Sequence, residues 1–420
     1  MTPRSPLADP RPYNPDGQPY FRSFDPESVP SPAFVVDRAA VEHNLRILHA
    51  VARESEAQIL LALKAFALPA VFDLVAKYLN GVCASGVYEA RMGRQEVAPH
   101  AADSGRFGVH TFAPAYSDTD ALTLAELSDH LSFNSLSQLH RFRSNLTVLD
   151  SPRPSLGIRV NPEFSVGATP LYDPCAPFSR LGTTETELRR EIQELGGVDR
   201  ALDGVQGIHM HTLCENDSVA LEATLQALDS HFGWLLSRHE IRWLNLGGGH
   251  HITKPHYRRD HLVALIRALR DRYGVSVLLE PGEAVAIHSG VLVTTVLDTP
   301  RNGMNLAILD TSATAHMPDT LEMPYRPDVW GSAPPDSDGH LYRLGGQTCL
   351  AGDVIGDYRF SEPLRRGDRL VFDDMGHYTM VKTTTFNGIR RPAIATWDSG
   401  TEELVVHRWG VYEDFRTPLG

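Results

Sequence analysis

The lysine near the end of the apolar run Gln58–Ala65 (QILLALKA) could act as a nucleophile. The run has the length of a strand, and Lys64 stands close to its carboxyl end. Lysine side chains are seldom fully buried, and a lysine at a strand end commonly extends its ammonium to solvent. In an apolar pocket the same amine would be desolvated and available as the neutral nucleophile for Schiff-base chemistry. This run alone leaves both interpretations open.

Two histidines, His209 and His211, alternate in the segment GIHMHTLCE. On a strand this spacing points both imidazoles to the same side. Such a pair could bind a metal ion, as in a hydrolase built on a barrel. Apart from Glu280, no third histidine or group of carboxylates follows a neighbouring predicted strand, which disfavours the metal. The alternative is a flat imidazole that lies against a flat aromatic cofactor.

Glycines follow two of the predicted strands, in LNLGGG (Leu244–Gly249) and in Glu280-Pro281-Gly282. Bare backbone of this kind lets N–H groups approach an anion such as phosphate. Tight turns without any ligand are rich in glycine too, so GGG alone is a weak signal. A second glycine, Gly282, on the neighbouring strand would give a phosphate-type site a second approach.

A lone cysteine, Cys349, lies in the glycine-rich segment GGQTCLAGD. Most lone cysteines are packing residues. A cysteine in an exposed loop near an active site could instead donate a proton, since its thiol titrates not far above neutral pH.

The elements that would position these residues alternate between strands and helices. The segment Arg38–Arg53 has helical spacing, with Val41, Leu45, Leu48 and Val51 on one face. Eight runs are typical of strands, each followed by a plausible helix: Gln58–Ala65, Val82–Ser85, Arg106–Thr111, His130–Asn134, Leu156–Val160, Val205–His211, Arg242–Leu246 and Val275–Glu280. This pattern predicts an α/β fold with a parallel (β/α)8 barrel, whose active site lies at the carboxyl ends of its strands.

A mainly antiparallel β domain is expected to follow the barrel. Its predicted strands are Val291–Leu297, Asn305–Leu309, Asp368–Phe372, Tyr378–Thr384 and Glu403–Trp409. The short strand Ala33–Asp37 could join this domain. The sequence therefore predicts a proline-rich extended arm over residues 1–30, a barrel over 38–288, and a β domain formed by 31–37 and 289–420.

The composition of the chain limits the kinds of molecule that it is expected to bind. The chain has 420 residues and a net charge of -13, from 39 basic and 52 acidic residues. No basic stripe is present to neutralise phosphates, so nucleic acid is not expected, whereas a cationic small molecule is compatible. Four cysteines lie far apart without a CxxC pair, which favours a reducing cytoplasm. No apolar run reaches membrane-spanning length and the first residues lack the core of a secretory signal, so no membrane partner is expected.

Longer motifs carry a resemblance to a known family. They run in order from about Ser31 to beyond Asn387, and they are LALKAFA, GIHMHTLCE, LGGGH, EPGEA, HMPDTLEMPYRP, GQTCLAGD and DDMGHYTMVKTTTFNG. The chain resembles the carboxynorspermidine/carboxyspermidine decarboxylases, which are pyridoxal-phosphate enzymes with an alanine-racemase-like fold, related to ornithine and diaminopimelate decarboxylases. GGG or EPG alone would indicate only the superfamily, whereas the two longest motifs are much more specific.

The resemblance implies roles for residues across the chain. Lys64 matches the lysine that forms the Schiff base with pyridoxal phosphate, His211 the imidazole stacked on the cofactor ring, and Glu280 the acid that hydrogen-bonds the ring nitrogen. Racemases of this fold carry an arginine at the position of Glu280, so the acid favours decarboxylation. Arg159 matches the barrel arginine beside the cofactor. The groups that match the phosphate-binding residues are Gly248, Gly249, Gly282 and Tyr378.

The resemblance also implies a homodimer. Cys349 resembles the loop cysteine that enters the active site of the partner subunit in these enzymes, so the subunits would share their active sites. There its thiol would return a proton to the carbon that loses carbon dioxide.

Two departures from ornithine and diaminopimelate decarboxylases match the polyamine branch. Cys214 replaces a phosphate-binding serine, and Glu283 replaces an arginine. An acid at 283 would suit a substrate with extra ammonium groups, such as carboxynorspermidine or carboxyspermidine. The acids that could hold these ammonium groups are Glu283, Asp310, Asp319 and Glu322, unless they cap loops or pair with Arg326 and Arg343. The alternatives are a decarboxylase of ornithine or lysine, a non-catalytic binding homologue, and the metal hydrolase.

Overall fold

The structure is a computed structural model that describes residues 20–101, 107–146, 154–166 and 171–420. Residues 1–19 of the expected arm and Arg106, the first residue of an expected strand, lie outside these ranges. The chain divides into two compact units. The barrel unit comprises residues 44–285, and the sheet unit comprises residues 286–420 with the segment before residue 44. No helix in the described ranges is both long and apolar enough to cross a membrane.

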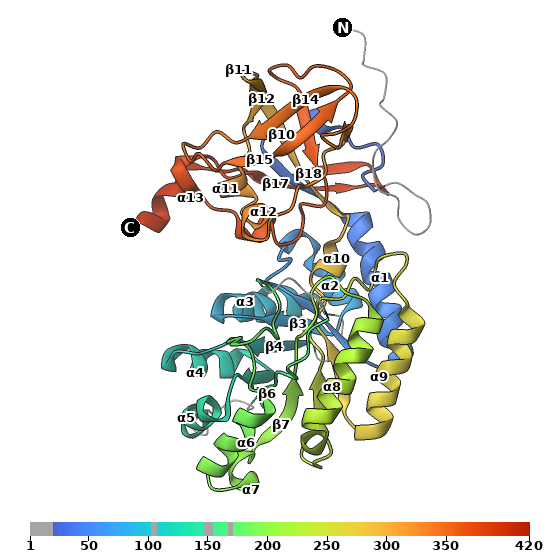
Figure 1. Ribbon diagram of the computed structural model, residues 1–420, viewed down its shortest axis with the longest axis vertical. Helices are drawn as coiled ribbons and strands as arrows, with labels where there is room; N and C mark the ends of the chain where they lie inside the picture. Colours follow the sequence, from blue (N-terminus) through green and yellow to red (C-terminus); the bar gives the residue numbers. More distant parts are fainter. Residues whose placement is uncertain (1–19, 102–106, 147–153, 167–170) are drawn as a thin grey trace. The chain divides into compact units, whose positions relative to one another are not determined.

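Eight parallel strands close into a barrel in sequence order, as predicted (Figure 1). Pairing of β2 with β9, through Gln58 with Leu278 and Ile59 with Leu279, closes it. The largest difference from a predicted boundary is at β2, which ends at Ala62 and not at Ala65. The strands are β2 (Gln58–Ala62), β3 (Gly81–Ala84), β4 (Gly108–Phe112), β5 (His130–Phe133), β6 (Ser155–Arg159), β7 (Val205–His209), β8 (Trp243–Asn245) and β9 (Ser276–Leu279).

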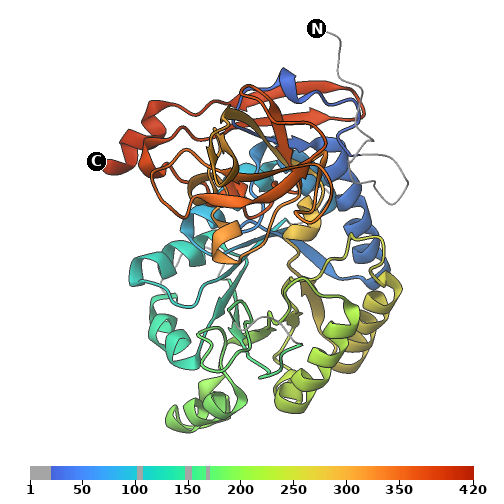
Figure 2. The same ribbon diagram turned by 45° about the horizontal axis from the view of Figure 1, so that its top comes forward.

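Helices surround these strands, as Figure 2 shows in the blue, teal, green and yellow parts of the chain. The Asp217 carboxylate caps α8 by accepting hydrogen bonds from two backbone N–H groups of its first turn, and Gly274 ends α9 in the left-handed conformation. The helices of the barrel unit are α2 (Phe72–Tyr78), α3 (Val87–Met92), α4 (Asp118–Leu127), α5 (Leu136–Leu146), α6 (Glu185–Glu194), α7 (Val198–Ala201), α8 (Ser218–Leu236), α9 (Arg259–Tyr273) and α10 (Glu283–Ala286).

Helix α1 (Arg38–Ser55) contains the point where the chain passes from one unit to the other. All four of its predicted apolar residues, Val41, Leu45, Leu48 and Val51, are buried. The helical spacing therefore identified the buried face of this element correctly.

The sheet unit contains one ten-stranded, mostly antiparallel sheet. Strand β1 joins it as expected, antiparallel to β10 and parallel to β17. Strands β11, β13, β14, β15 and β17 were not predicted from the sequence. The strands are β1 (Ala33–Asp37), β10 (Gly290–Asp298), β11 (Arg301–Asn302), β12 (Met304–Leu309), β13 (Ser332–Ala333), β14 (His340–Gly345), β15 (Val354–Phe360), β16 (Arg369–Phe372), β17 (Ala393–Asp398) and β18 (Glu403–Arg408).

The strand predicted over Tyr378–Thr384 is wrong. This segment forms a turn followed by the single 3-10 turn η5 (Met380–Lys382), and Tyr378 has a φ of 50°. Its threonines and alternating pattern are typical of a strand. Tertiary contacts decide otherwise, because the Met375 N–H donates to the Gly290 carbonyl and fixes the chain at the start of the turn.

The last residues of the expected arm belong to the core of the sheet unit. Tyr20, Phe21, Phe24 and Val29 are buried and pack in one cluster with residues of β1, β10 and β17. The Phe21 N–H also donates to the Asp37 carboxylate at 2.9 Å. The interpretation of residues 20–30 as lying outside a core is therefore wrong. The prolines and polar residues of the segment obscured three aromatic side chains that bury large apolar areas.

Candidate active site

Lys64 follows the end of β2 in a turn, where the Ala65 N–H donates to the Ala62 carbonyl. Its side chain is exposed. The Lys64 ammonium is nevertheless close enough to the His211 ring to lower the pKa of that imidazole. The structure thus brings together Lys64 and His211, two of the predicted cofactor residues, at the carboxyl ends of the strands.

The His211 imidazole is held in the neutral state. Its Nδ1 atom accepts a hydrogen bond from the Gly248 N–H at 2.8 Å, which assigns the ring proton to Nε2. Burial, followed by the positive charges of Lys64 and Arg159, lowers the pKa of His211 well below its usual range. The site therefore contains a flat uncharged ring in a fixed orientation.

Glu280 is held as a carboxylate at the end of β9. Its Oε1 atom accepts a hydrogen bond from the Asn245 amide at 2.6 Å, and its Oε2 atom lies 3.5 Å from His209 Nε2. Burial opposes ionisation, but His209 and the Asn245 hydrogen bond outweigh it and hold the pKa of Glu280 below its usual range. His209 and Asn245 therefore stabilise the carboxylate from its two oxygens.

Arg159 is a buried cation behind His211. Its Nη2 atom donates to the His211 carbonyl at 3.2 Å, and its guanidinium carbon lies 4.4 Å from the centre of the Phe112 ring. Burial lowers the pKa of Arg159 to about 10, so the guanidinium remains charged at neutral pH. Arg159 thus contributes positive charge to the strand ends, as expected of the barrel arginine.

Gly248, Gly249 and Gly282 are required by close packing of the backbone. A Cβ atom at Gly248 would lie 2.2 Å from the Glu280 carbonyl, and one at Gly249 would lie 1.9 Å from the Leu213 carbonyl. At Gly282 it would lie 2.5 Å from the Ala65 Cβ atom, next to Lys64. These glycines allow the loops after β2, β7, β8 and β9 to meet, so that backbone lies where a side chain would otherwise stand.

Glu283, the first residue of α10, already has a partner in the barrel unit. Its Oε1 atom accepts a hydrogen bond from His251 Nε2 at 2.8 Å. His251 belongs to the segment that follows the glycines, and Thr253 Oγ1 in the same segment donates to the Ala284 carbonyl at 2.7 Å. These bonds join the loop after β8 to the start of α10. That Glu283 binds substrate stays a prediction, and His251 would compete with the substrate for its carboxylate.

Cys349 lies in the loop between β14 and β15 of the sheet unit, and it is exposed. Its N–H donates to Asn387 Oδ1 at 2.6 Å. The buried carboxylate of Asp353 holds the same loop, since it accepts hydrogen bonds from the N–H and the hydroxyl of Thr348 and from the Ser312 hydroxyl. The thiol is thus presented to the surface by a fixed loop.

Tyr378 is positioned by the acidic turn after β16. The Asp374 carboxylate accepts the His288 N–H at 2.7 Å and lies 3.3 Å from His377 Nε2. Burial opposes its ionisation, but His377 and His288 lower the pKa of Asp374 to about 2. The turn that precedes Tyr378 is therefore organised by a charged carboxylate.

Of the predicted substrate acids in the sheet unit, Asp319 has a carboxylate oxygen that finds no hydrogen-bond partner among the described residues. Its Oδ2 atom accepts the Tyr325 and Thr379 hydroxyls at 2.7 and 2.8 Å, whereas Oδ1 is buried without a hydrogen bond. Asp310 is engaged by Thr294 and Thr295.

The other predicted pairings differ from expectation. Glu322 pairs with Lys382 at 2.6 Å, and Arg343 binds Asp357 in place of any of the predicted acids. Among the described residues no group of three or more His, Cys, Asp or Glu side chains could hold a metal ion.

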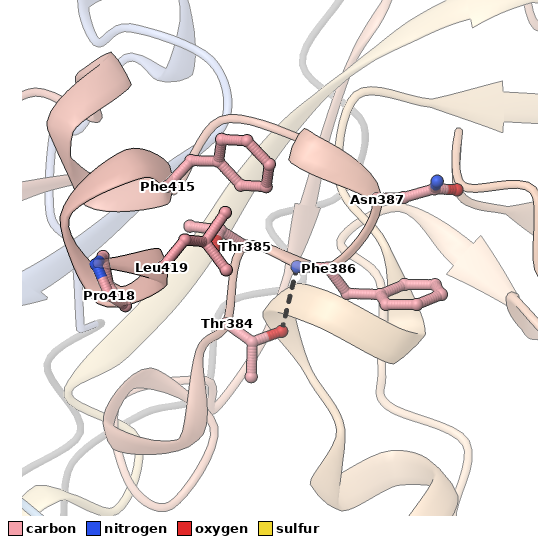
Figure 3. Close-up of a pocket in the computed structure, with 7 residues that line it drawn as sticks. All are labelled: Thr384, Thr385, Phe386, Asn387, Phe415, Pro418 and Leu419. Carbon is pink, nitrogen blue, oxygen red and sulfur yellow. Dashed lines mark hydrogen bonds between the residues drawn. The ribbon is translucent and has the colours of Figure 1, made fainter.

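Figure 3 shows a hollow in the sheet unit. None of the predicted site residues lines it, but its wall includes Asn387, the partner of the Cys349 N–H. The lining residues are Thr384, Thr385, Phe386, Asn387, Phe415, Pro418 and Leu419. We assign no part of the cofactor chemistry to this hollow.

Sequence reasoning missed four residues of this arrangement: Asn245, His251, Asp353 and Asn387. Asn245 had a local signal, since an asparagine two residues before a glycine in the left-handed conformation is typical of a side-chain-stabilised turn. The partners of His251 and Asn387 lie far away in the sequence, so no local pattern identified them. Asp353 has one near partner, Thr348, and one distant partner, Ser312.

Comparison with known proteins agrees with this geometry. The sequence pattern of a family described as "Pyridoxal-dependent decarboxylase, C-terminal sheet domain" matches residues 33–376. The carboxyaminopropylagmatine decarboxylase of Synechocystis is 42% identical, with 94% of this chain and 96% of that protein covered. The carboxynorspermidine/carboxyspermidine decarboxylase of Campylobacter jejuni is 39% identical, with 93% and 98% covered.

A solved structure extends the likeness to the fold. The carboxynorspermidine decarboxylase of Campylobacter jejuni, complexed with norspermidine, is 38% identical and superimposes with a TM-score of 0.81, covering 93% of this chain and 100% of that one. The chain belongs to the pyridoxal-dependent decarboxylases, in the group that includes the carboxynorspermidine/carboxyspermidine decarboxylases.

Proposed function

We propose that this protein removes carbon dioxide from a carboxylated polyamine, carboxynorspermidine or carboxyspermidine, with pyridoxal phosphate bound at the carboxyl ends of the barrel strands. The observation that carries the proposal is the Glu280 carboxylate, held ionised by His209 and Asn245 beside the neutral His211 ring. A carboxylate at this place favours a protonated ring nitrogen, and a protonated ring is the better acceptor of electrons.

The residues of the barrel unit fit the cofactor. Lys64 offers an amine from the turn whose next residue, Ala65, packs against Gly282. His211 offers an uncharged flat ring that can stack on an aromatic ring. The packed glycines bring backbone close to the place where a phosphate would be held, and Arg159 adds positive charge.

Bound pyridoxal phosphate would supply the electron sink for the electron pair that remains when carbon dioxide leaves. Lys64 would hold the cofactor until the amine of the substrate replaces it. Glu280 would accept the N–H of the ring nitrogen and keep that proton in place, while His211 would fix the plane of the ring. Cys349 would return a proton to the carbon that lost the carboxylate.

The substrate tail carries two ammonium groups that need carboxylates. Asp319 is the strongest candidate, because its buried Oδ1 atom has no hydrogen-bond partner in the part of the chain that the structure describes. Glu283 and Asp310 remain candidates with existing hydrogen bonds. Each charge-assisted contact would contribute about 1.5–3 kcal/mol to substrate binding.

A second candidate substrate ends in a guanidinium group. The relative from Synechocystis at 42% identity is named a carboxyaminopropylagmatine decarboxylase, which supports testing that compound beside the two carboxylated triamines. A planar guanidinium binds a carboxylate through two parallel hydrogen bonds, a geometry that an ammonium cannot reproduce.

We propose further that the protein is a cytoplasmic homodimer in which Cys349 reaches the active site of the partner subunit. The exposed side chain of Cys349 and the neighbouring Leu350, which is 47% exposed, support a loop that packs against another chain.

The test is a steady-state comparison of kcat/KM for carboxynorspermidine, carboxyspermidine, carboxyaminopropylagmatine, ornithine and lysine. We expect a carboxylated polyamine to give the highest value and the cofactor-loaded protein to absorb visible light. Borohydride converts the C=N bond between lysine and cofactor to a stable C–N bond, so the treated wild type should keep the cofactor when free cofactor is removed, whereas treated Lys64→Ala should lose it. A higher kcat/KM for ornithine or lysine than for every carboxylated polyamine would overturn the proposed substrate class.

A further inference from the structure

Asn245, at the end of β8, uses both ends of its side-chain amide within the site. Its Nδ2 atom donates to Glu280 Oε1 at 2.6 Å, and its Oδ1 atom accepts the Gly247 N–H at 2.8 Å. The residue is 2% exposed, so neither bond is exchanged readily with water. The Asn245 side chain therefore joins the Glu280 carboxylate to the loop Gly247–Gly249, called the glycine loop below.

The same connection continues to the stacking histidine. The Gly247 carbonyl accepts the Glu280 N–H at 2.7 Å, and the next residue, Gly248, donates its N–H to His211 Nδ1. The Asn245 carbonyl accepts the Met210 N–H at 2.8 Å, directly before His211 in the chain. Asn245 is thus hydrogen-bonded to the residues that follow β7 and β9, and to Gly247 in the glycine loop.

We propose that Asn245 is a positioning residue that sets the place and the charge of Glu280 and, through the glycine loop, the orientation of His211. An amide suits this role because it donates a proton to the carboxylate without competing for one. An aspartate at 245 would place a second carboxylate next to Glu280, and the two would share a proton. The inference rests on the proposed binding of pyridoxal phosphate at this site.

The variants Asn245→Ala and Asn245→Asp test the role in the full-length protein. Thr253→Val is the matched control, because it removes the buried hydrogen bond to the Ala284 carbonyl from the same loop without touching Glu280. The readouts are the dissociation constant of pyridoxal phosphate, the chemical shift of its ring nitrogen when labelled with nitrogen-15, and the Tm of the cofactor-free protein.

We expect both Asn245 variants to raise the dissociation constant at least about 10-fold, because a buried carboxylate loses its donor. The ring-nitrogen signal should move toward that of the unprotonated ring. Thr253→Val should lower the Tm but leave the ring-nitrogen signal at its wild-type position.

An unchanged ring-nitrogen signal in both Asn245 variants overturns the inference, even if their affinity falls, since a purely structural role gives that result. Failure of the wild-type protein to bind pyridoxal phosphate would instead refute the proposed function. The two failures are therefore distinguishable in one set of measurements.

Discussion

His250 should make the barrel unit sensitive to mild acid. It follows the glycine loop and is 2% exposed, and a 3.0 Å hydrogen bond joins its Nδ1 atom to the Tyr257 hydroxyl. Burial, followed by the neighbouring His251, lowers the pKa of His250 from 6.5 to about 4. The folded state thus holds this imidazole neutral at pH values where the unfolded chain would protonate it.

The sign and size of the effect follow from linkage. Below pH 6.5 the unfolded chain binds the proton and the folded chain does not, so stability is complete above that pH and falls as the pH decreases toward 4. For pKa values of 6.5 and about 4, lowering the pH from 7.5 to 5.5 costs about 1.3 kcal/mol. In a unit of this size that corresponds to a Tm change of roughly 3–5 °C.

The assay compares thermal unfolding of the wild type and of His250→Gln, both cofactor-free, at pH 7.5 and 5.5. The variant should lose about 1.3 kcal/mol less than the wild type over this interval, because glutamine does not titrate. Any constant cost of the substitution cancels in this double difference. His239→Gln is the control, since the side chain of His239 is 89% exposed. If His250→Gln keeps the full pH dependence of the wild type, the linkage argument is wrong.

Three further predictions concern the proposed chemistry. Glu280→Gln should lower kcat on the order of 100-fold, because it removes the charge that keeps the ring nitrogen protonated; an undiminished kcat contradicts this role. Asp319→Asn should raise KM for the carboxylated polyamine about 10-fold or more with an unchanged cofactor spectrum, and loss of that spectrum would argue against a substrate contact. Mixed subunits of Lys64→Ala and Cys349→Ala should recover about a quarter of wild-type activity if the active sites are shared, whereas sites within one chain recover none.

The barrel could be predicted from the sequence because its signals are local. Each strand is a short apolar run, each is followed by a helical segment, and parallel order follows from that alternation. The segment Tyr378–Thr384 shows the limit of such signals, since its strand-like pattern has no partner strand and the chain turns instead. The arm shows another limit, because Phe21 and Phe24 are buried by strands that are distant in sequence.

The reactive or ionisable residues assigned to the cofactor ring could be predicted from the sequence. Lys64, His211 and Glu280 lie at the strand ends where the alternation of elements placed them. Asn245 and His251 were missed, because their roles depend on which strand end lies beside which other. An asparagine side chain is neither a nucleophile nor an acid or base, so Asn245 did not stand out in the sequence. Its hydrogen bond to Glu280 became evident only from the pairing of β8 with β9.

The division of the predicted groups between the two units has an experimental consequence. The groups assigned to the cofactor ring, namely Lys64, His211 and Glu280, all belong to the barrel unit, whereas Asp319 and Cys349 belong to the sheet unit. Substitutions at the first set should therefore change the spectrum or the affinity of the cofactor. Substitutions at the second should change KM or the rate of proton return while the spectrum stays as in the wild type. Tyr378, a sheet-unit residue assigned to the phosphate, is the informative exception: Tyr378→Phe should weaken cofactor binding without altering the ring-nitrogen signal that Asn245 and Glu280 control.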